Sequence, residues 1–118
     1  MTTNDIEILA LAYKASQAWR EYAAMRAIVD RAEEYMNSIP LLNNPKDNFD
    51  EYEAAYNILC DFRVTLDCYA SVRDNAFLNW RHKLPEMNSF IAYNRCNTMA
   101  RQYETLLQNS YLQFIKSV

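Results

Sequence analysis

None of the 118 residues of this chain is glycine. A soluble domain of this length carries about eight glycines at average usage. Glycine supplies the positive φ angles of tight hairpin turns, phosphate-binding loops and many helix ends. Its absence therefore disfavours β-hairpins, dinucleotide-binding and Walker A loops, and the nucleophile elbow of hydrolases. Such a chain is expected to form a few long helices joined by few turns.

Composition and charge narrow the class of protein. Apolar residues make up 51% of the chain and charged residues 23%, which is typical of a globular protein rather than a disordered one. The length suits a single domain covering residues 1–118. The net charge of −3 excludes a generally basic nucleic-acid-binding protein. The sequence shows neither a long apolar run nor a signal-peptide pattern. We therefore expect a cytoplasmic protein that binds no membrane.

The cysteines and the single histidine limit the chemistry of the chain. Cys60 and Cys68 lie eight residues apart, about 12 Å along one helix, which is too far for a disulfide. With Cys96 they are expected to be reduced thiols, as in an intracellular protein. His82 is the only histidine, and the sequence has neither a Cys-x-x-Cys nor a Glu-x-x-His pair. These patterns predict no metal site and no cofactor.

Prolines and capping residues divide the chain into three helices. Residues 4–7 (Asn-Asp-Ile-Glu) are predicted to form a capping box that opens the first helix, which runs to about Ser38. Residues 39–47 contain two prolines and two asparagines and are predicted to be a loop. A second box at residues 48–51 opens the second helix, which runs to about Lys83. Pro85 is predicted to lie in the first turn of the third helix.

Apolar residues recur every three or four positions along all three predicted helices. An average period of about 3.5 residues predicts supercoiled seams between helices. Three such helices with short connections predict an all-α fold, an antiparallel up-down-up three-helix bundle. Trp19 and Trp80 fall within these rows and are predicted to be core residues. The rows are Ile8, Ala12, Ala15, Trp19, Tyr22, Arg26, Val29, Glu33 and Met36; Tyr52, Ala55, Leu59, Phe62, Leu66, Tyr69, Arg73, Ala76 and Trp80; and Tyr93, Cys96, Ala100, Tyr103, Leu107, Ser110 and Phe114.

One pole of the bundle is predicted to be acidic. The end of the first helix, the start of the second and the end of the third are predicted to meet there. The helix dipole favours acids at the start of a helix but disfavours Asp30, Glu33 and Glu34 in the last turns of the first. The alternatives are an ordinary solvated face and a docking patch for a basic surface. The residues predicted to contact such a partner are Asp30, Glu33, Glu34, Asp47, Asp50, Glu51 and Glu53.

Aromatic residues provide a second candidate surface. The chain holds nine Tyr, five Phe and two Trp, more than one thin core is expected to bury. Ile6, Tyr13, Ile28 and Tyr35 are predicted to project from the back of the first helix, away from its core row. Tyrosine is enriched at protein interfaces, although scattered exposed apolar residues are also normal. Tyr13, Ile28 and Tyr35 therefore form a second candidate partner-binding set.

Arg73 is the most unusual polar residue of the core rows. No acid of the first or third helix is expected at its level. Such an arginine reaches solvent, or bonds Tyr93 or a backbone carbonyl, or receives an anionic ligand or a carboxylate of a partner. The last alternative predicts a nucleotide-like ligand bound by Arg73, Arg95 and Arg101.

No set of residues in the sequence indicates catalysis. His82 lies among basic neighbours at a helix end, where the helix dipole explains it, and no catalytic residue is predicted. The aromatic and basic run at 80–83 is too little to predict nucleic-acid binding. We expect a non-enzymatic protein-binding module, an adaptor or a stoichiometric inhibitor that occludes a partner with a basic surface, for example one encoded by a phage or mobile element. The alternatives are an anionic-ligand sensor and a structural subunit that forms homo-oligomers.

Overall fold

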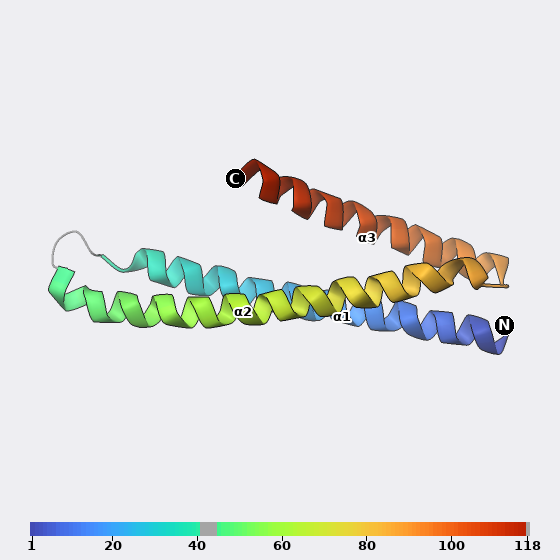
Figure 1. Ribbon diagram of the computed structural model, residues 1–118, viewed down its shortest axis with the longest axis horizontal. Helices are drawn as coiled ribbons and strands as arrows, with labels where there is room; N and C mark the ends of the chain where they lie inside the picture. Colours follow the sequence, from blue (N-terminus) through green and yellow to red (C-terminus); the bar gives the residue numbers. More distant parts are fainter. Residues whose placement is uncertain (41–44, 118) are drawn as a thin grey trace. The chain divides into compact units, whose positions relative to one another are not determined.

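The computed structural model describes the backbone of residues 1–40 and 45–117 and the side chains of residues 1–40 and 48–108. The fold is an all-α, antiparallel up-down-up three-helix bundle, with no strand in those ranges (Figure 1). The elements are α1 (Thr3–Ser38), α2 (Pro45–Lys83), the 3-10 helix η1 (Leu84–Glu86) and α3 (Phe90–Ser117). The predicted fold class is confirmed, and the first two helices end where predicted. None of the described helices is apolar enough over a sufficient length to cross a bilayer.

The helices pack into two compact units. Unit 1 comprises Met1–Ala15 and Asn75–Val118, and unit 2 comprises Ser16–Asp74. Unit 1 therefore contains three helical segments, whereas unit 2 contains two, the later part of α1 and the earlier part of α2. Both α1 and α2 continue from one unit into the other without a break. The single domain expected for residues 1–118 stays a prediction.

The capping box of α1 is formed by Thr2 and Asp5, and not by residues 4–7 as predicted. The backbone N–H of Asp5 donates to Thr2 Oγ1 over 3.2 Å, and the backbone N–H of Thr2 donates to Asp5 Oδ2 over 3.2 Å. The helix accordingly begins at Thr3. The threonine hydroxyl and the aspartate provide the two reciprocal hydrogen bonds of a capping box two residues earlier in the chain.

The starts of the other two helices also differ from the predictions. α2 begins at Pro45, ahead of the predicted box at residues 48–51, because the fixed φ of proline suits the first turn of a helix. Pro85 lies in η1 and not in α3. α3 begins at Phe90, after Ser89, whose Oγ accepts a hydrogen bond of 3.3 Å from the backbone N–H of Ala92. Serine satisfies an amide of the first turn in this way at many helix starts.

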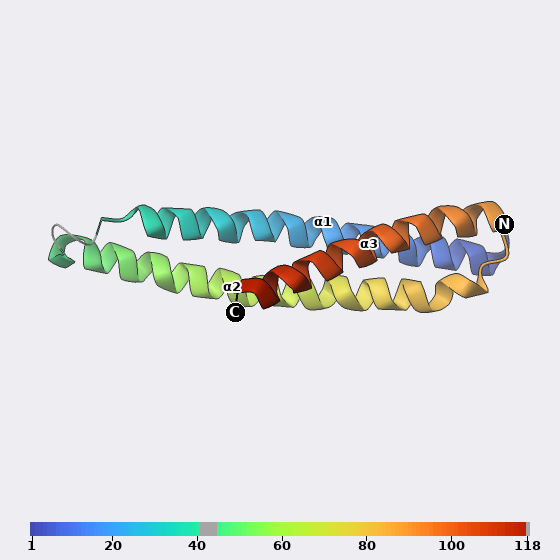
Figure 2. The same cartoon turned by 90° about the horizontal axis from the view of Figure 1, so that it is seen from above.

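The core of unit 1 is built around Trp80. In this unit α3 returns from η1 beside the first part of α1 and the last part of α2 (Figures 1 and 2). Trp80 is fully buried, and its ring meets Phe77 and Tyr103 in edge-to-face contacts with centroids 6.1 and 6.0 Å away. Such contacts stabilise aromatic pairs beyond simple burial. The buried cluster is Ile8, Ala12, Ala15, Phe77, Trp80, Leu84, Cys96 and Ala100, so the prediction that Trp80 is a core residue is confirmed.

A polar network ties the start of α1 to the connection between η1 and α3. Asp5 Oδ1 accepts a hydrogen bond of 2.7 Å from the backbone N–H of Asn88. The Asn4 side chain donates to the carbonyl of Glu86 over 3.0 Å, and the Asn88 side chain donates to Thr2 Oγ1 over 3.2 Å. Asp5 is buried, and the hydrogen bond from Asn88, together with those from Thr2, lowers the pKa of its carboxyl below 3.8. Hydrogen bonds to a carboxylate favour its charged form.

The core of unit 2 is a seam between two antiparallel helical segments. Val29 of α1 packs with Leu59 and Leu66 of α2, all three buried. Partly buried residues surround them, namely Tyr22, Met25, Ala32, Met36 and Phe62. All eight except Met25 and Ala32 belong to the predicted core rows, which are therefore largely confirmed in this unit.

Candidate protein-binding surface

The acidic charge of the chain is concentrated in unit 2. This unit holds six basic and eleven acidic residues, a net charge of −5. Unit 1 holds six basic and four acidic residues, a net charge of +2, and the two values together give the −3 of the whole chain. A surface with this excess of acid attracts basic partners and raises their rate of association.

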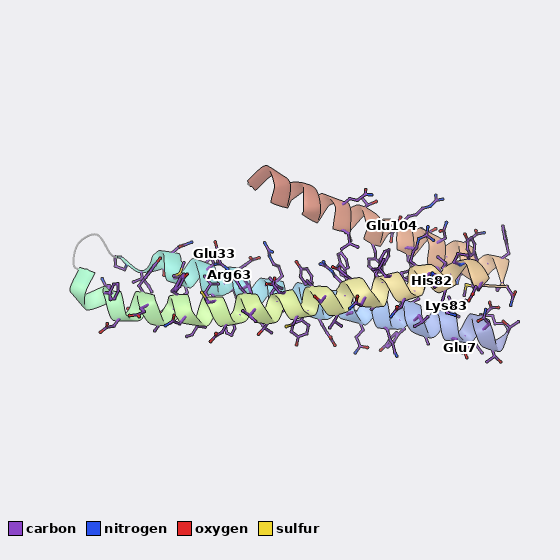
Figure 3. The ribbon with its side chains drawn as sticks, viewed as in Figure 1. Glu7, Glu33, Arg63, His82, Lys83 and Glu104 are labelled. Carbon is purple, nitrogen blue, oxygen red and sulfur yellow. The ribbon has the colours of Figure 1, made fainter. Side chains whose placement is uncertain are left out.

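Two of the acids singled out at the end of α1 have basic partners within unit 2. Asp30 lies 3.4 Å from Arg26, one turn earlier on α1. Glu33 lies 3.5 Å from Arg63 of α2, and Figure 3 shows this pair. Exposed pairs of this kind contribute at most about 1 kcal/mol. The charges of Asp30 and Glu33 are thus partly offset by Arg26 and Arg63, pairings that the sequence did not reveal.

Five acids of the candidate set are exposed on the surface, and a sixth is half-buried. Asp30, Glu34, Asp50, Glu51 and Glu53 are exposed, and Glu33 is half-buried. The side chain of Asp47 lies outside the described residues. The binding role predicted for this set stays a prediction.

The exposed Tyr35 side chain extends from α1 toward α2. Its hydroxyl donates a hydrogen bond of 2.6 Å to Glu51 Oε1 on α2. This hydrogen bond, together with the negative charge of Glu51, raises the pKa of the Tyr35 hydroxyl above 10.0. Tyr35 is exposed and lies outside the core row, as predicted, and its hydroxyl in addition contacts the second helix. The residue lies on a flank that α1 and α2 share in unit 2.

Ile28 and Ile58 continue this shared flank. Ile28 precedes Tyr35 by seven residues, and Ile58 follows Glu51 by seven. Seven residues make two helical turns, so Ile28 and Ile58 lie on the same flank of their helices as Tyr35 and Glu51, the side marked by the Tyr35–Glu51 hydrogen bond. Their exposed fractions are 46% and 51%. Ile58 was not among the predicted partner-binding residues, because the sequence alone does not show that Glu51 lies beside Tyr35.

Tyr13 and Ile6 are exposed, as predicted, but they belong to unit 1. Ile28 and Tyr35 belong to unit 2. The predicted back face is therefore divided between the two units, and only its later part lies on the acidic one.

Arg73 is buried against aromatic rings. Its guanidinium carbon lies 4.0 Å from the centroid of the Tyr22 ring and 5.0 Å from that of Trp19. Its Nε donates a hydrogen bond of 3.0 Å to Asp74 Oδ1, the next residue of the same helix. The carboxylate partner of Arg73 is thus the next residue of its own helix, and not an acid of the first or third helix. The charge of Arg73 is thus balanced by Asp74 and by the faces of two rings.

Nη1 of Arg73 has no hydrogen-bond partner among the described residues, but the atom is buried. Arg95 and Arg101 are exposed residues of unit 1, whereas Arg73 belongs to unit 2. Their joint role in binding an anion stays a prediction. In the part of the chain that the structure describes, no three His, Cys, Asp or Glu side chains gather closely enough to hold a metal ion.

Comparisons of the chain with protein-family models, with curated proteins and with solved structures found no match.

Proposed function

We propose that this protein is a non-enzymatic protein-binding module that covers a basic surface of its partner with unit 2. The observation that supports the proposal is the combination, in one compact unit, of a net charge of −5 with exposed apolar side chains at Ile28, Tyr35 and Ile58. Charge steers the encounter of two proteins, and desolvated apolar and aromatic residues supply most of the binding energy. An adaptor and an occluding inhibitor both act in this way.

The test compares two triple variants that remove the same charge. The first, Asp30→Asn with Glu33→Gln and Glu34→Gln, neutralises three acids of unit 2. The matched control, Glu7→Gln with Glu86→Gln and Glu104→Gln, neutralises three acids of unit 1. Each variant breaks two surface ion pairs, since Glu86 lies 3.5 Å from Lys83 and Glu104 lies 2.8 Å from Arg81.

Affinity capture from the native cells identifies the partner, and stopped-flow mixing then measures association. The unit 2 variant is expected to associate roughly tenfold more slowly than wild type at low salt, with a flatter salt dependence. The unit 1 control is expected to match the wild type or to associate faster. Equal rates for wild type and the unit 2 variant would refute an acidic docking surface.

A further inference from the structure

The shared flank of unit 2 is a strip of apolar side chains that no described residue covers. Tyr35, Ile28 and Ile58 are 54%, 46% and 51% exposed. Met25 and Ala32 lie three residues before and four after Ile28, and Phe62 lies four after Ile58, so all three border the same strip. They are partly buried against the core of unit 2. The partly buried residues of the strip therefore adjoin the core of unit 2, whereas Ile28, Tyr35 and Ile58 are exposed to solvent.

The opposite flank of unit 2 carries an ion pair between the two helices. Arg63 of α2 and Glu33 of α1 meet across it at 3.5 Å (Figure 3). At the equivalent seven-residue positions in unit 1, the side chains are apolar: Ala12 lies three heptads before Glu33, and Phe77 two heptads after Arg63. These two residues are buried in the cluster that α3 completes. Unit 1 thus covers its apolar flank with a third helix, whereas unit 2 leaves its own apolar flank open.

We propose that the flank of unit 2 formed by Ile28, Tyr35 and Ile58 is the docking site of an amphipathic helix with basic edges, supplied by a partner protein. This inference rests on the proposed function and names the kind of partner. A helix laid on the strip completes a three-helix core in unit 2, as α3 does in unit 1. From the level of Tyr35 to that of Glu21 the strip spans two heptads, about 21 Å, enough for about 14 helical residues.

The charges beside the strip favour a basic helix over a second copy of this protein as its occupant. Its borders carry the exposed acids Glu21, Glu51 and Asp61 against one base, Arg31. A second copy of unit 2 would bring a net charge of −5 against another −5, which is unfavourable. A helix with lysine or arginine on both edges places opposite charges beside these acids while its apolar face covers Ile28 and Ile58.

The probe is a synthetic helix of about 18 residues made of leucine and lysine, with leucine at positions i, i+3, i+4 and i+7. Two comparison peptides keep its length. One has the same composition in scrambled order and therefore no apolar face, and the other carries glutamate in place of lysine. Binding to the full-length protein is measured by fluorescence anisotropy. The wild type is expected to bind the basic amphipathic helix at least about tenfold more tightly than either comparison peptide.

Two double variants locate the site on the protein. Ile28→Asp with Ile58→Asp places two charges on the strip. Val64→Asp with Leu78→Asp places the same two charges at apolar positions of α2 that are 65% and 60% exposed and lie off the strip. Both variants attract a basic peptide more strongly by net charge alone. The strip variant is nevertheless expected to lose about tenfold in affinity, and the control to keep or exceed wild-type affinity. Circular dichroism confirms that both remain helical.

Three results would overturn the inference. The first is equal binding of the scrambled and amphipathic peptides, and the second is unchanged binding to the strip variant. The third is self-association of the wild type in sedimentation experiments that the strip variant abolishes, because a second copy would then be the occupant. If the peptide fails while the captured partner still depends on Asp30, Glu33 and Glu34, this inference falls and the proposed function stands.

Discussion

The guanidinium carbon of Arg73 lies 4.0 Å from the centroid of the Tyr22 ring, in the seam between α2 and α1 of unit 2. The Arg73 side chain is 9% exposed, and its ionic partner Asp74 is 49% exposed. The cation is therefore largely removed from water while its counter-charge stays hydrated. The ring faces of Tyr22 and Trp19 replace part of the lost hydration.

The first prediction concerns how substitutions of Arg73 change the free energy of unfolding. Arg73→Met is expected to change the free energy of unfolding by less than about 1 kcal/mol, because the apolar side chain fills the site and Asp74 is hydrated. Arg73→Lys is expected to be about 1–3 kcal/mol less stable than Arg73→Met, since a compact ammonium is more strongly hydrated and lacks the planar stack. Urea unfolding at neutral pH measures both. A lysine variant as stable as the methionine variant would contradict the stacking account.

The same variants test the anionic-ligand alternative. A nucleotide that binds through Arg73 raises the melting temperature of the wild type by mass action. The effect should disappear in Arg73→Met, which keeps the fold. A thermal-shift screen with nucleotides and inorganic phosphate provides the measurement, and a shift that survives the substitution would exclude Arg73 as the ligand-binding residue.

We expect Asp5 to make the free energy of unfolding depend on pH. Its folded pKa lies below 3.8, chiefly because Asn88 donates a backbone hydrogen bond to the carboxylate. A carboxyl with a lowered folded pKa contributes stability above its unfolded pKa, and this contribution is lost as the pH falls through the folded value. Asp5→Asn is therefore expected to be less stable than wild type at about pH 7, and the difference is expected to shrink as the pH falls from 3.8 through the lower pKa of the folded state. Urea midpoints at several pH values measure it; a constant difference at every pH would refute the role of the charge.

Truncation of the Trp80 side chain is expected to cause a large loss of stability. The side chain is fully buried among Phe77, Tyr103 and the apolar cluster of unit 1. Trp80→Ala is expected to cost about 3–5 kcal/mol, which is enough to unfold a marginal bundle. Leu78→Ala, two residues earlier on α2 at a position 60% exposed, is the control and is expected to change stability by less than about 0.5 kcal/mol. Similar losses for the two variants in chemical denaturation would contradict the assigned core.

The two tryptophans report on the two units separately. Trp19 belongs to unit 2 and Trp80 to unit 1, so Trp80→Phe and Trp19→Phe each leave one probe. Because α1 and α2 run through both units without a break, we expect the fluorescence of each probe to follow one transition that coincides with the loss of helical signal. Trp80→Phe should be tolerated because its buried Nε1 has no hydrogen-bond partner among the described residues. Two separate midpoints would show that the single predicted domain is wrong.

Local sequence patterns were enough to predict the helices and much of the core. The missing glycines and the 3.5-residue rows predicted the all-α bundle, and Ile8, Leu59, Trp80 and Ala100 are buried as the rows required. Helix starts were less predictable. Several polar residues near each terminus offered similar caps, and the choice of Thr2 with Asp5 over Asn4 with Glu7 depended on contacts made by Asp5 with Asn88, which is 83 residues away in sequence.

The sequence by itself determined where the chain is helical, which residues repeat along each helix and how strongly acidic the first two helices are where they meet. Only the tertiary structure decided what those residues touch. The pairing of Tyr35 with Glu51, and of Glu33 with Arg63, depends on the register of two antiparallel helices, which no local pattern encodes. The Tyr35–Glu51 contact also places Ile28 and Ile58 on one flank, because it fixes which side each seven-residue ladder occupies. That placement turns two exposed isoleucines into a candidate docking site.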